Sequence, residues 1–381
     1  MSTAPTTLLE LRDAVRDLRG PVVATGAGTA ADWAGTVAAD ATPVSVAGLS
    51  GVITHNPGDM TVAVGAGTPL ADLQAAVGAS GQRVAFDAPR AARGATVGGL
   101  FATADAGPLA LGFGSLRDLV IGVTVVLADG TVARAGGHVI KNVAGYDLAK
   151  LLHGAQGTFG VLAEIVLRLH PVPAAARTVA LRVPDVAGLP AAGRAVTDTP
   201  VEAAALEWHD GRLLALLEGT EAGVAGRADR LVDLLGDGAE VLSPADADAA
   251  WAAHRAAVDV RPADRAVVRI GVAPTLLGGL LTDLAADAGA AGITAAPATG
   301  VATLTVPAEP AAVDAVHARV AAARGTSTLR ARPGGADLPA WGPAPSSAVL
   351  LRAVAASLDP DHRLGRGRLA PWLSPTTGVS A

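Results

Sequence analysis

The residues best suited to chemistry in this sequence are glycines that follow predicted strands. Gly26-x-Gly28-x-x-Ala31 comes directly after the strand VVAT and formally matches the fingerprint of dinucleotide-binding folds. That fingerprint also requires an acidic residue at the end of the next strand, where it holds ribose hydroxyls. The next strand, PVSVAGL (43–49), contains no acid. A glycine turn without a ligand therefore explains this segment as well as a nucleotide site does.

A second glycine cluster favours a phosphate-binding site. GATVGGLFATADAG (94–107) is followed closely by GFGSLRD (112–118). Consecutive backbone amides without bulky side chains form a concave nest that suits a pyrophosphate. The Ser, Thr and Asp side chains beside these glycines add further hydrogen-bonding groups. Two such nests predict a large cofactor.

The histidines of the chain do not predict a catalytic base or a metal site, because none of them shows paired spacing. Arg269, in the predicted strand RAVVRIGVA, has the charge to hold a substrate carboxylate, but a strand arginine is more often an ion-pair partner or a solvated group. We assign no catalytic residue and expect no metal. The eight histidines are His55, His138, His153, His170, His209, His254, His317 and His362.

Both lysines of the chain and its only tyrosine fall within KNVAGYDLAKLLHGAQGTFG, residues 141–160. The pattern predicts a loop, a short helix and a turn, with Asp147 capping the helix and Gly154 ending it in a left-handed conformation. We interpret Lys141 and Tyr146 as structural clamps that hold this turn, and the glycines downstream as contacts to a ligand.

Composition argues against several classes of function. A net charge of −6 without basic runs is unsuited to nucleic acid, whose phosphates require clustered Lys and Arg. The absence of cysteine excludes disulfides, thiol nucleophiles and cysteine-ligated iron–sulfur clusters on this chain. No run of about 18 apolar residues predicts a membrane span, and the first residues lack the pattern of a signal peptide. We therefore expect a cytoplasmic protein.

Hydrophobic periodicity divides the chain into two regions that differ in the lengths and order of their predicted strands and helices. The first half predicts a helix over 6–19, a strand over 60–67 followed by a helix that Thr68-Pro69 opens, a hairpin over 118–136 and a last strand over 161–173. After about residue 175, longer strands and helices alternate, which predicts an antiparallel sheet with helices on one face. The predicted strands there cover 181–184, 201–208, 211–219, 265–273 and 302–307, and the helices cover 222–236, 244–257 and 311–323.

Several of these segments, in this order, resemble the FAD-binding oxidoreductases of the vanillyl-alcohol oxidase or PCMH type. Within that group they resemble most the smaller FAD-binding subunits of bacterial glycolate oxidases. The resemblance covers about 20–172 and the tail, whereas the middle region matches in size and strand pattern. The segments are the loop after the first strand, TVAVGAGTPLADLQAAV, ATVGGLFATADAG, GSLRDLVIGVTVVLADG, KNVAGYDLAKLLHGAQGTFGVLAEIVLRLHP and LDPDHRLGRGRL.

The resemblance implies an α+β fold with a PCMH-type FAD-binding domain over 1–172. This domain would consist of two α/β subdomains, about 1–55 and 56–172. An antiparallel-sheet cap domain on the substrate side would cover 173–330. Residues 331–381 would form a linker and a C-terminal tail that returns to the FAD domain.

The resemblance also implies a noncovalent FAD site, since the loop from Thr25 to Ala30 contains no histidine that could link to the flavin. This loop would face the pyrophosphate, although the family has more consecutive glycines there. Segment 98–107 would line the pyrophosphate and isoalloxazine, and segment 157–161 would close over the adenine side. The implied contacts are Thr25, Gly26, Ala27, Gly28, Thr29, Ala30, Gly98, Gly99, Ala102, Thr103, Ala104, Gly107, Ser115, Asp118, Gly157, Gly160 and Val161.

In function, the resemblance implies an FAD-binding subunit of a complex that oxidises a small 2-hydroxy acid such as glycolate or D-lactate. Its partners would be a catalytic FAD-linked oxidase subunit and an iron–sulfur subunit, and any association with a membrane would come through them. Two alternatives stay open. One is a self-sufficient FAD-dependent oxidase or dehydrogenase, and the other is a flavin-free structural subunit of such a complex.

Overall fold

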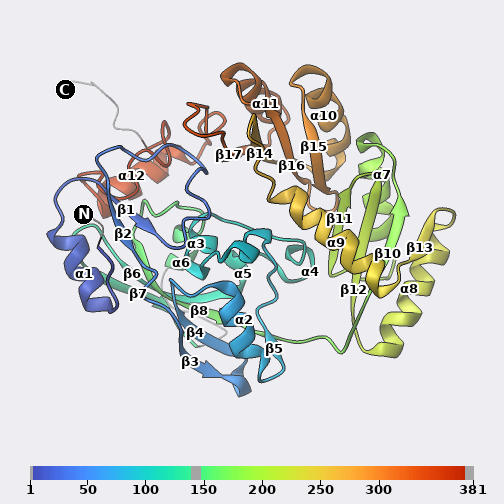
Figure 1. Cartoon of the computed structure of the whole chain (residues 1–381), viewed down its shortest axis with the longest axis horizontal. Coiled ribbons are helices and arrows are strands. Elements are labelled where there is room, and N and C mark those ends of the chain that lie inside the picture. The colour runs from blue at the N-terminus through green and yellow to red at the C-terminus, as the bar shows by residue number, and fades with distance from the viewer. Residues whose placement is uncertain (1–2, 139–146, 374–381) are drawn as a thin grey trace. The chain divides into compact units, whose positions relative to one another are not determined.

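The computed structural model of the protein describes residues 3–138 and 147–373 (Figure 1). Lys141 and Tyr146, interpreted above as clamps, lie outside the described residues. The chain divides into two compact units. The first comprises residues 1–106, 115–172 and 344–381, and the second comprises residues 107–114 and 173–343.

The first unit begins with helix α1 (Leu8–Asp17) and a parallel pair of strands, β1 (Val22–Thr25) and β2 (Thr42–Ser45). The Thr7 side chain caps α1 by accepting a hydrogen bond from the Glu10 N–H group. Residues 26–41, which connect the two strands, contain no helix. This connection differs from the strand–helix–strand unit of a nicotinamide-binding fold.

A five-stranded antiparallel sheet forms the larger part of the first unit, with strand order β3-β4-β8-β6-β7. The predicted hairpin over 118–136 is confirmed, and Gly130 in its turn has a φ of 86°. The strands are β3 (Val52–Asn56), β4 (Thr61–Gly65), β6 (Val120–Val126), β7 (Val132–Gly136) and β8 (Val161–Arg168), and a separate pair is formed by β5 (Gln82–Arg83) and β9 (His170–Pro171).

Short helices pack on this sheet around a core of Val, Leu and Phe side chains. The helix predicted to open at Thr68-Pro69 is α2, in which Pro69 occupies the N-cap position. The Thr68 hydroxyl does not cap this helix and donates instead to the Gly65 carbonyl at 2.6 Å. The helices are α2 (Leu70–Gly78), α3 (Val97–Ala102), α5 (Leu116–Leu119), α6 (Leu148–Leu152) and α12 (Ala348–Leu358), with single turns η1 (Pro57–Asp59) and η2 (Pro89–Arg93).

The predicted short helix after residue 147 is confirmed as α6. Asp147 occupies its N-cap position, but its side chain makes no capping hydrogen bond in the structure. Gly154 follows the helix with a φ of 76°, which is the predicted left-handed stop.

The second unit contains an eight-stranded antiparallel sheet with strand order β13-β10-β12-β11-β15-β16-β14-β17. An antiparallel sheet was predicted for this region, and it is confirmed. Its strands are β10 (Ala175–Arg182), β11 (Ala205–His209), β12 (Arg212–Gly219), β13 (Ala239–Val241), β14 (Arg265–Gly271), β15 (Ala291–Ala296), β16 (Val301–Pro307) and β17 (Thr326–Ala331).

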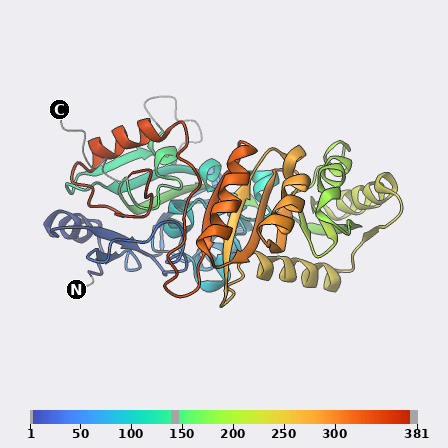
Figure 2. The same cartoon turned by 90° about the horizontal axis from the view of Figure 1, so that it is seen from above.

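Helices cover both faces of this sheet, whereas the sequence predicted helices on one face. Val179 packs in the large core with α7, α8, α10 and α11, and its strand neighbour Ala180 packs on the opposite face against Trp251 of α9. Figure 2 shows α10 and α11 side by side along the sheet. The helices are α4 (Ala110–Phe113), α7 (Leu189–Thr197), α8 (Glu221–Leu235), α9 (Pro244–Val258), α10 (Pro274–Asp287) and α11 (Pro310–Ala322), with the single turn η3 (Val186–Gly188).

Candidate functional site

The loop that follows β1 forms the first wall of the site. The loop leaves the sheet at Thr25, whose carbonyl accepts a hydrogen bond from the Val46 N–H group at 2.8 Å. Gly28 has a φ of 69°, and among the described residues no atom lies within 4 Å of the position that a Cβ would take there. A Cβ at Gly26 would collide with the Thr96 hydroxyl. Glycine at position 26 therefore permits close packing, and glycine at position 28 leaves space open.

Helix α3 forms the second wall. Thr96 caps the helix, and its Oγ1 accepts a hydrogen bond from the Gly99 N–H group at 3.2 Å. The Gly98 N–H group donates to the Ala66 carbonyl at 2.8 Å, and a Cβ at Gly98 would lie only 2.7 Å from that oxygen. The small residues of this segment thus let the helix backbone approach both β4 and the first loop.

The turn between α6 and β8 forms the third wall. Gln156 and Gly157 both have left-handed backbones, with φ angles of 56° and 77°. The Gln156 N–H group donates to the Ala102 carbonyl at 2.8 Å, which joins this turn to the end of α3. A left-handed backbone is uncommon for a residue other than glycine, so Gln156 is held in place by its surroundings.

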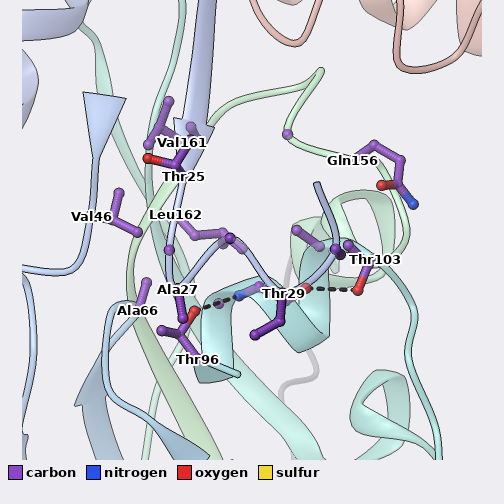
Figure 3. Close-up of a pocket in the computed structure, with 18 of the residues that line it drawn as sticks. Thr25, Ala27, Thr29, Val46, Ala66, Thr96, Thr103, Gln156, Val161 and Leu162 are labelled. Atoms are coloured by element: carbon purple, nitrogen blue, oxygen red, sulfur yellow. Dashed lines mark hydrogen bonds between the residues drawn. The ribbon is translucent and has the colours of Figure 1, made fainter. Parts of the chain in front are cut away.

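The three walls enclose a cavity in the first unit (Figure 3). Its empty volume, including the part open to solvent, is about 830 Å³. All but four of the residues predicted from the sequence line it. Those that do are Thr25, Gly26, Ala27, Gly28, Thr29, Ala30, Gly98, Gly99, Ala102, Thr103, Gly157, Gly160 and Val161.

Four predicted residues do not line the cavity. Ser115 and Asp118 form a capping box at the start of α5, where the Asp118 carboxylate accepts from the Ser115 N–H group at 3.0 Å. Gly107 belongs to the second unit. Ala104 has a left-handed backbone with a φ of 48° and donates its N–H group to the Phe101 carbonyl. These residues thus have structural roles that their sequence motifs do not distinguish from ligand contacts.

Nine residues of the cavity were not predicted from the sequence. Some of them adjoin predicted residues, as Ala31 and Leu162 do, and could have been found by extending the motifs. Others, such as Arg90 and Arg368, come from distant segments and carry no glycine signal. The missed residues are Ala24, Ala31, Val46, Ala66, Arg90, Thr96, Gln156, Leu162 and Arg368.

Arginine side chains supply positive charge around the first loop. Arg90 is buried and forms an ion pair with Asp105 at 2.8 Å. Arg93 donates to the Thr29 carbonyl at 3.1 Å, and Arg368 donates to the Ala31 carbonyl at 2.9 Å. Guanidinium groups suit phosphate oxygens in charge and in geometry. The cavity can therefore accept an anionic ligand.

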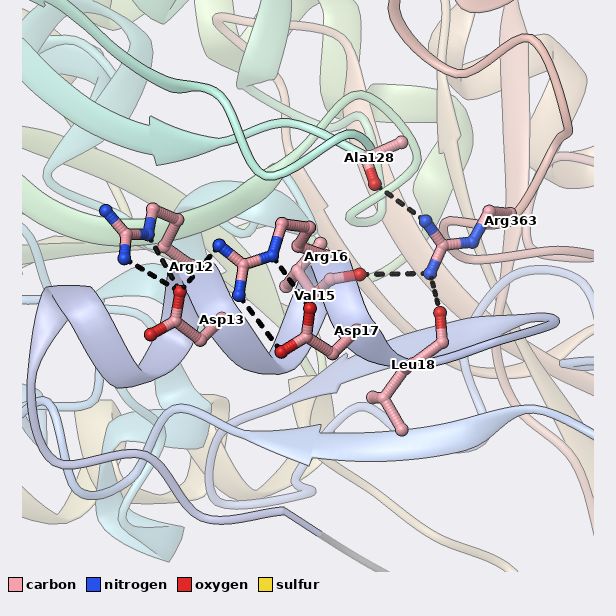
Figure 4. Close-up of polar contacts among 8 residues, drawn as sticks. All are labelled: Arg12, Asp13, Val15, Arg16, Asp17, Leu18, Ala128 and Arg363. Carbon is pink, nitrogen blue, oxygen red and sulfur yellow. Dashed lines mark hydrogen bonds and ion pairs between the residues drawn. The ribbon is translucent and has the colours of Figure 1, made fainter.

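Arg368 reaches the cavity because the C-terminal tail is fixed to the first unit. The Val22 N–H group donates to the Arg363 carbonyl, and the Gly365 N–H group donates to the Val22 carbonyl, each at 2.8 Å. The Arg363 side chain donates to the carbonyls of Ala128, Val15 and Leu18 (Figure 4). The tail thus lies along β1 and closes the end of α1.

All eight histidines lie in the described part of the chain, and none of them lines the cavity. Burial, together with the charges of Arg117 and Lys150, lowers the pKa of His153 to about 4. The spacing of His209 and His254 in the sequence suggested no pair, yet their rings lie 6.5 Å apart in the second unit, and His254 Nε2 lies 3.2 Å from Glu207 Oε2.

Within residues 3–138 and 147–373, no cluster of three or more His, Cys, Asp or Glu side chains could hold a metal ion. No helix formed by these residues is both long enough and apolar enough to cross a membrane.

Comparisons with known proteins relate this site to FAD. Residues 3–136 match the family model of the FAD binding domain. The chain is 39% identical over 125 residues to glycolate oxidase subunit GlcE of Escherichia coli, a match that covers 33% of this chain and 36% of the relative. It is 41% identical over 114 residues to D-lactate dehydrogenase of Archaeoglobus fulgidus, covering 30% of this chain and 25% of the relative. These matches therefore span little more than a third of the relatives' length.

A solved structure of alkyldihydroxyacetonephosphate synthase has the same fold, with a TM-score of 0.66 over 96% of this chain and 75% of that one, at 15% identity. The predicted α+β fold with a PCMH-type FAD-binding domain is confirmed. The glycine-rich walls of the cavity and the arginines beside the first loop fit a dinucleotide with a pyrophosphate. Residues 3–136 therefore form an FAD binding domain, and FAD is the cofactor of that domain.

Proposed function

We propose that this chain is the FAD-binding subunit of a complex that oxidises a small 2-hydroxy acid such as glycolate or D-lactate. The observation that carries the proposal is the cavity lined by three small-residue segments, which lies in a unit containing an FAD binding domain. The names of the relatives, glycolate oxidase subunit and D-lactate dehydrogenase, support the substrate class.

The cavity residues would hold FAD without a covalent bond. The loop from Thr25 to Ala30 consists of Thr, Gly and Ala, so it offers no side chain that links to a flavin. The space beside Gly28 would receive the pyrophosphate, and the guanidinium group of Arg368 would balance part of its charge. When bound, FAD supplies the two-electron acceptor for oxidation of the substrate.

Oxidation of a 2-hydroxy acid to a 2-oxo acid would also require a base that accepts the hydroxyl proton. We assign that base to no residue of this chain and propose that residues 173–330 lie on the substrate side. A catalytic FAD-linked oxidase subunit is the proposed partner for the chemistry. Because the chain contains no cysteine, a separate iron–sulfur subunit would carry the electrons onward.

The absorbance spectrum of the purified chain tests this proposal. We expect the spectrum of an oxidised flavin, and we expect glycolate or D-lactate to bleach it anaerobically only when the partner subunits are present. Bleaching of the isolated chain would instead indicate a self-sufficient oxidase or dehydrogenase. A chain that takes up no FAD would refute the proposal in favour of a flavin-free subunit, and failure to co-purify with a flavoprotein or an iron–sulfur protein would refute the complex.

A further inference from the structure

Arg90 is a buried cation that joins two walls of the cavity. Only 2% of its side chain is exposed. Its Nε donates to Asp105 at 2.8 Å, its Nη1 donates to the Thr29 hydroxyl at 3.1 Å, and its Nη2 donates to the Thr103 hydroxyl at 2.8 Å. Thr29 lies in the loop after β1, whereas Thr103 and Asp105 follow α3. One guanidinium therefore links the first wall to the second.

The planar face of the Arg90 guanidinium also makes a contact, with an aromatic ring. The Arg90 Cζ atom lies 3.9 Å from the ring centroid of Trp33, which belongs to the connection between β1 and β2. Stacking of this kind favours arginine over lysine, because the guanidinium is planar and presents its N–H groups in a rigid fork. Three hydrogen bonds in different directions and one ring contact thus fix the side chain.

A buried charge is costly unless it is paired and hydrogen-bonded. Asp105 neutralises Arg90, and its own Oδ1 accepts a hydrogen bond from the Ala106 N–H group at 3.0 Å. Replacing such a pair by neutral side chains is often tolerated by a fold. The stability of the fold alone therefore does not explain this ion pair. Its position at the edge of the cavity indicates a role in shaping the cavity walls.

We infer that Arg90 is a positioning residue of the cofactor site, which holds the loop after β1 and the end of α3 in the arrangement that binds the FAD pyrophosphate. The inference rests on the proposed function. Residues 26–41 form no helix, and side-chain contacts supplement the few backbone hydrogen bonds that hold this connection. Arg90 makes such contacts at Thr29 and Trp33. Fixing a loop before the ligand arrives raises affinity, because less conformational freedom is lost on binding.

The test measures the affinity of the full chain for FAD, by titrating FAD into apo-protein and following flavin fluorescence. The variant is the double substitution Arg90→Met with Asp105→Asn, which removes both charges together and so avoids an unpaired buried carboxylate. We expect its Kd for FAD to rise about tenfold or more, since several charge-assisted hydrogen bonds that order the loop are lost. Arg90→Lys keeps the charge without the fork, and we expect it to bind FAD more weakly than the wild type.

A matched control separates positioning from stability. Val77 is fully buried in α2 and does not line the cavity, so Val77→Ala lowers stability without touching the site. We expect Val77→Ala to lower the urea midpoint of the apo-protein and to change the Kd for FAD less than twofold. For the double variant we expect the reverse, a large change in Kd at a similar urea midpoint.

The outcomes distinguish the two levels of the argument. If the wild-type chain binds no FAD, the proposed function fails, and the inference fails with it. If the wild type binds FAD and the double variant binds it equally well, only the inference fails. A double variant whose affinity falls no more than that of a destabilised control with the same urea midpoint would reduce Arg90 to a structural residue.

Discussion

Helix α3 can approach strand β4 closely because the side chain of Gly98 is only a hydrogen atom. At this position a Cβ would lie 2.7 Å from the Ala66 carbonyl oxygen and 2.8 Å from the Ala66 Cβ. An alanine side chain at this position would therefore force α3 away from β4. We expect Gly98→Ala to lower the free energy of unfolding by about 1–3 kcal/mol, as overpacking does, and to lower FAD retention, both measured on the purified chain.

Gly78, near the end of α2, provides the matched control. The position of a Cβ there has no described atom within 4 Å. Gly78→Ala should therefore leave FAD retention unchanged and should raise stability slightly, because alanine is the better helix former. Equal FAD retention in Gly98→Ala and Gly78→Ala would show that the close approach of α3 to β4 is not needed for the site.

At the residue scale, the sequence predicts cavity residues where backbone geometry makes glycine or alanine necessary. Gly28 and Gly157 belong to this group, since both have left-handed backbones. The sequence does not predict Arg90 or Arg368, because a side chain that reaches the cavity from a distant segment leaves no local pattern. Ser115 was assigned to the site for the opposite reason: its hydroxyl suits a ligand and a helix cap equally well, and the structure uses it as a cap.

Among the elements, the C-terminal tail is held in part by the side chain of Arg363. Its side chain donates to carbonyls at the end of α1 and to the Ala128 carbonyl at 2.7 Å. We expect Arg363→Met to lower the free energy of unfolding by about 2 kcal/mol or more, because several hydrogen bonds from a charged donor are lost. Limited proteolysis should then cut the tail faster.

Arg366 is exposed and stands three residues further along the same tail. Arg366→Met removes the same charge without those carbonyl contacts, and we expect it to leave the urea midpoint and the rate of cleavage near the wild-type values. A tail that is cleaved equally fast in both variants would show that Arg363 does not hold it.

Elements with clear periodicity were predicted, and elements determined by tertiary packing were not. The hairpin of β6 and β7 has two apolar strands and an Asp-Gly turn, and it was predicted closely. Helix α10 was omitted, because Gly278 and Gly279 lie within it and glycine disfavours helices. The structure supplies the reason for the first glycine, since a Cβ at Gly278 would lie 2.7 Å from the Val186 carbonyl. A local reading of sequence cannot detect such a contact.

On the scale of the whole molecule, buried histidines make stability depend on pH. His153 and His170 in the first unit, and His209 and His317 in the second, all have a lowered pKa, and burial is the largest cause in each case. Such a histidine is neutral in the folded state and takes up a proton more readily when unfolded. Its contribution to stability is therefore complete above about pH 6.5 and is lost as the pH falls.

We expect the free energy of unfolding to fall as the pH drops below about 6.5, and between pH 6.5 and pH 4 we expect His153 to contribute a slope of up to about 1.4 kcal/mol per pH unit. Urea unfolding at a series of pH values measures this slope. In His153→Gln the slope should decrease over this range, since the pKa of His153 is lowered to about 4. An unchanged slope in this variant would show that His153 takes no part in the pH dependence.

The tail also has a consequence for the order in which the protein is made. Residues 363–368 lie beside β1 and supply Arg368 to the cavity, although they are translated more than three hundred residues after the loop that they contact. Domains generally fold as their residues leave the ribosome. The second unit, which ends before residue 344, can therefore fold on the ribosome while the cavity still lacks its last arginine. We therefore expect FAD to bind firmly only after residues 363–368 have been made.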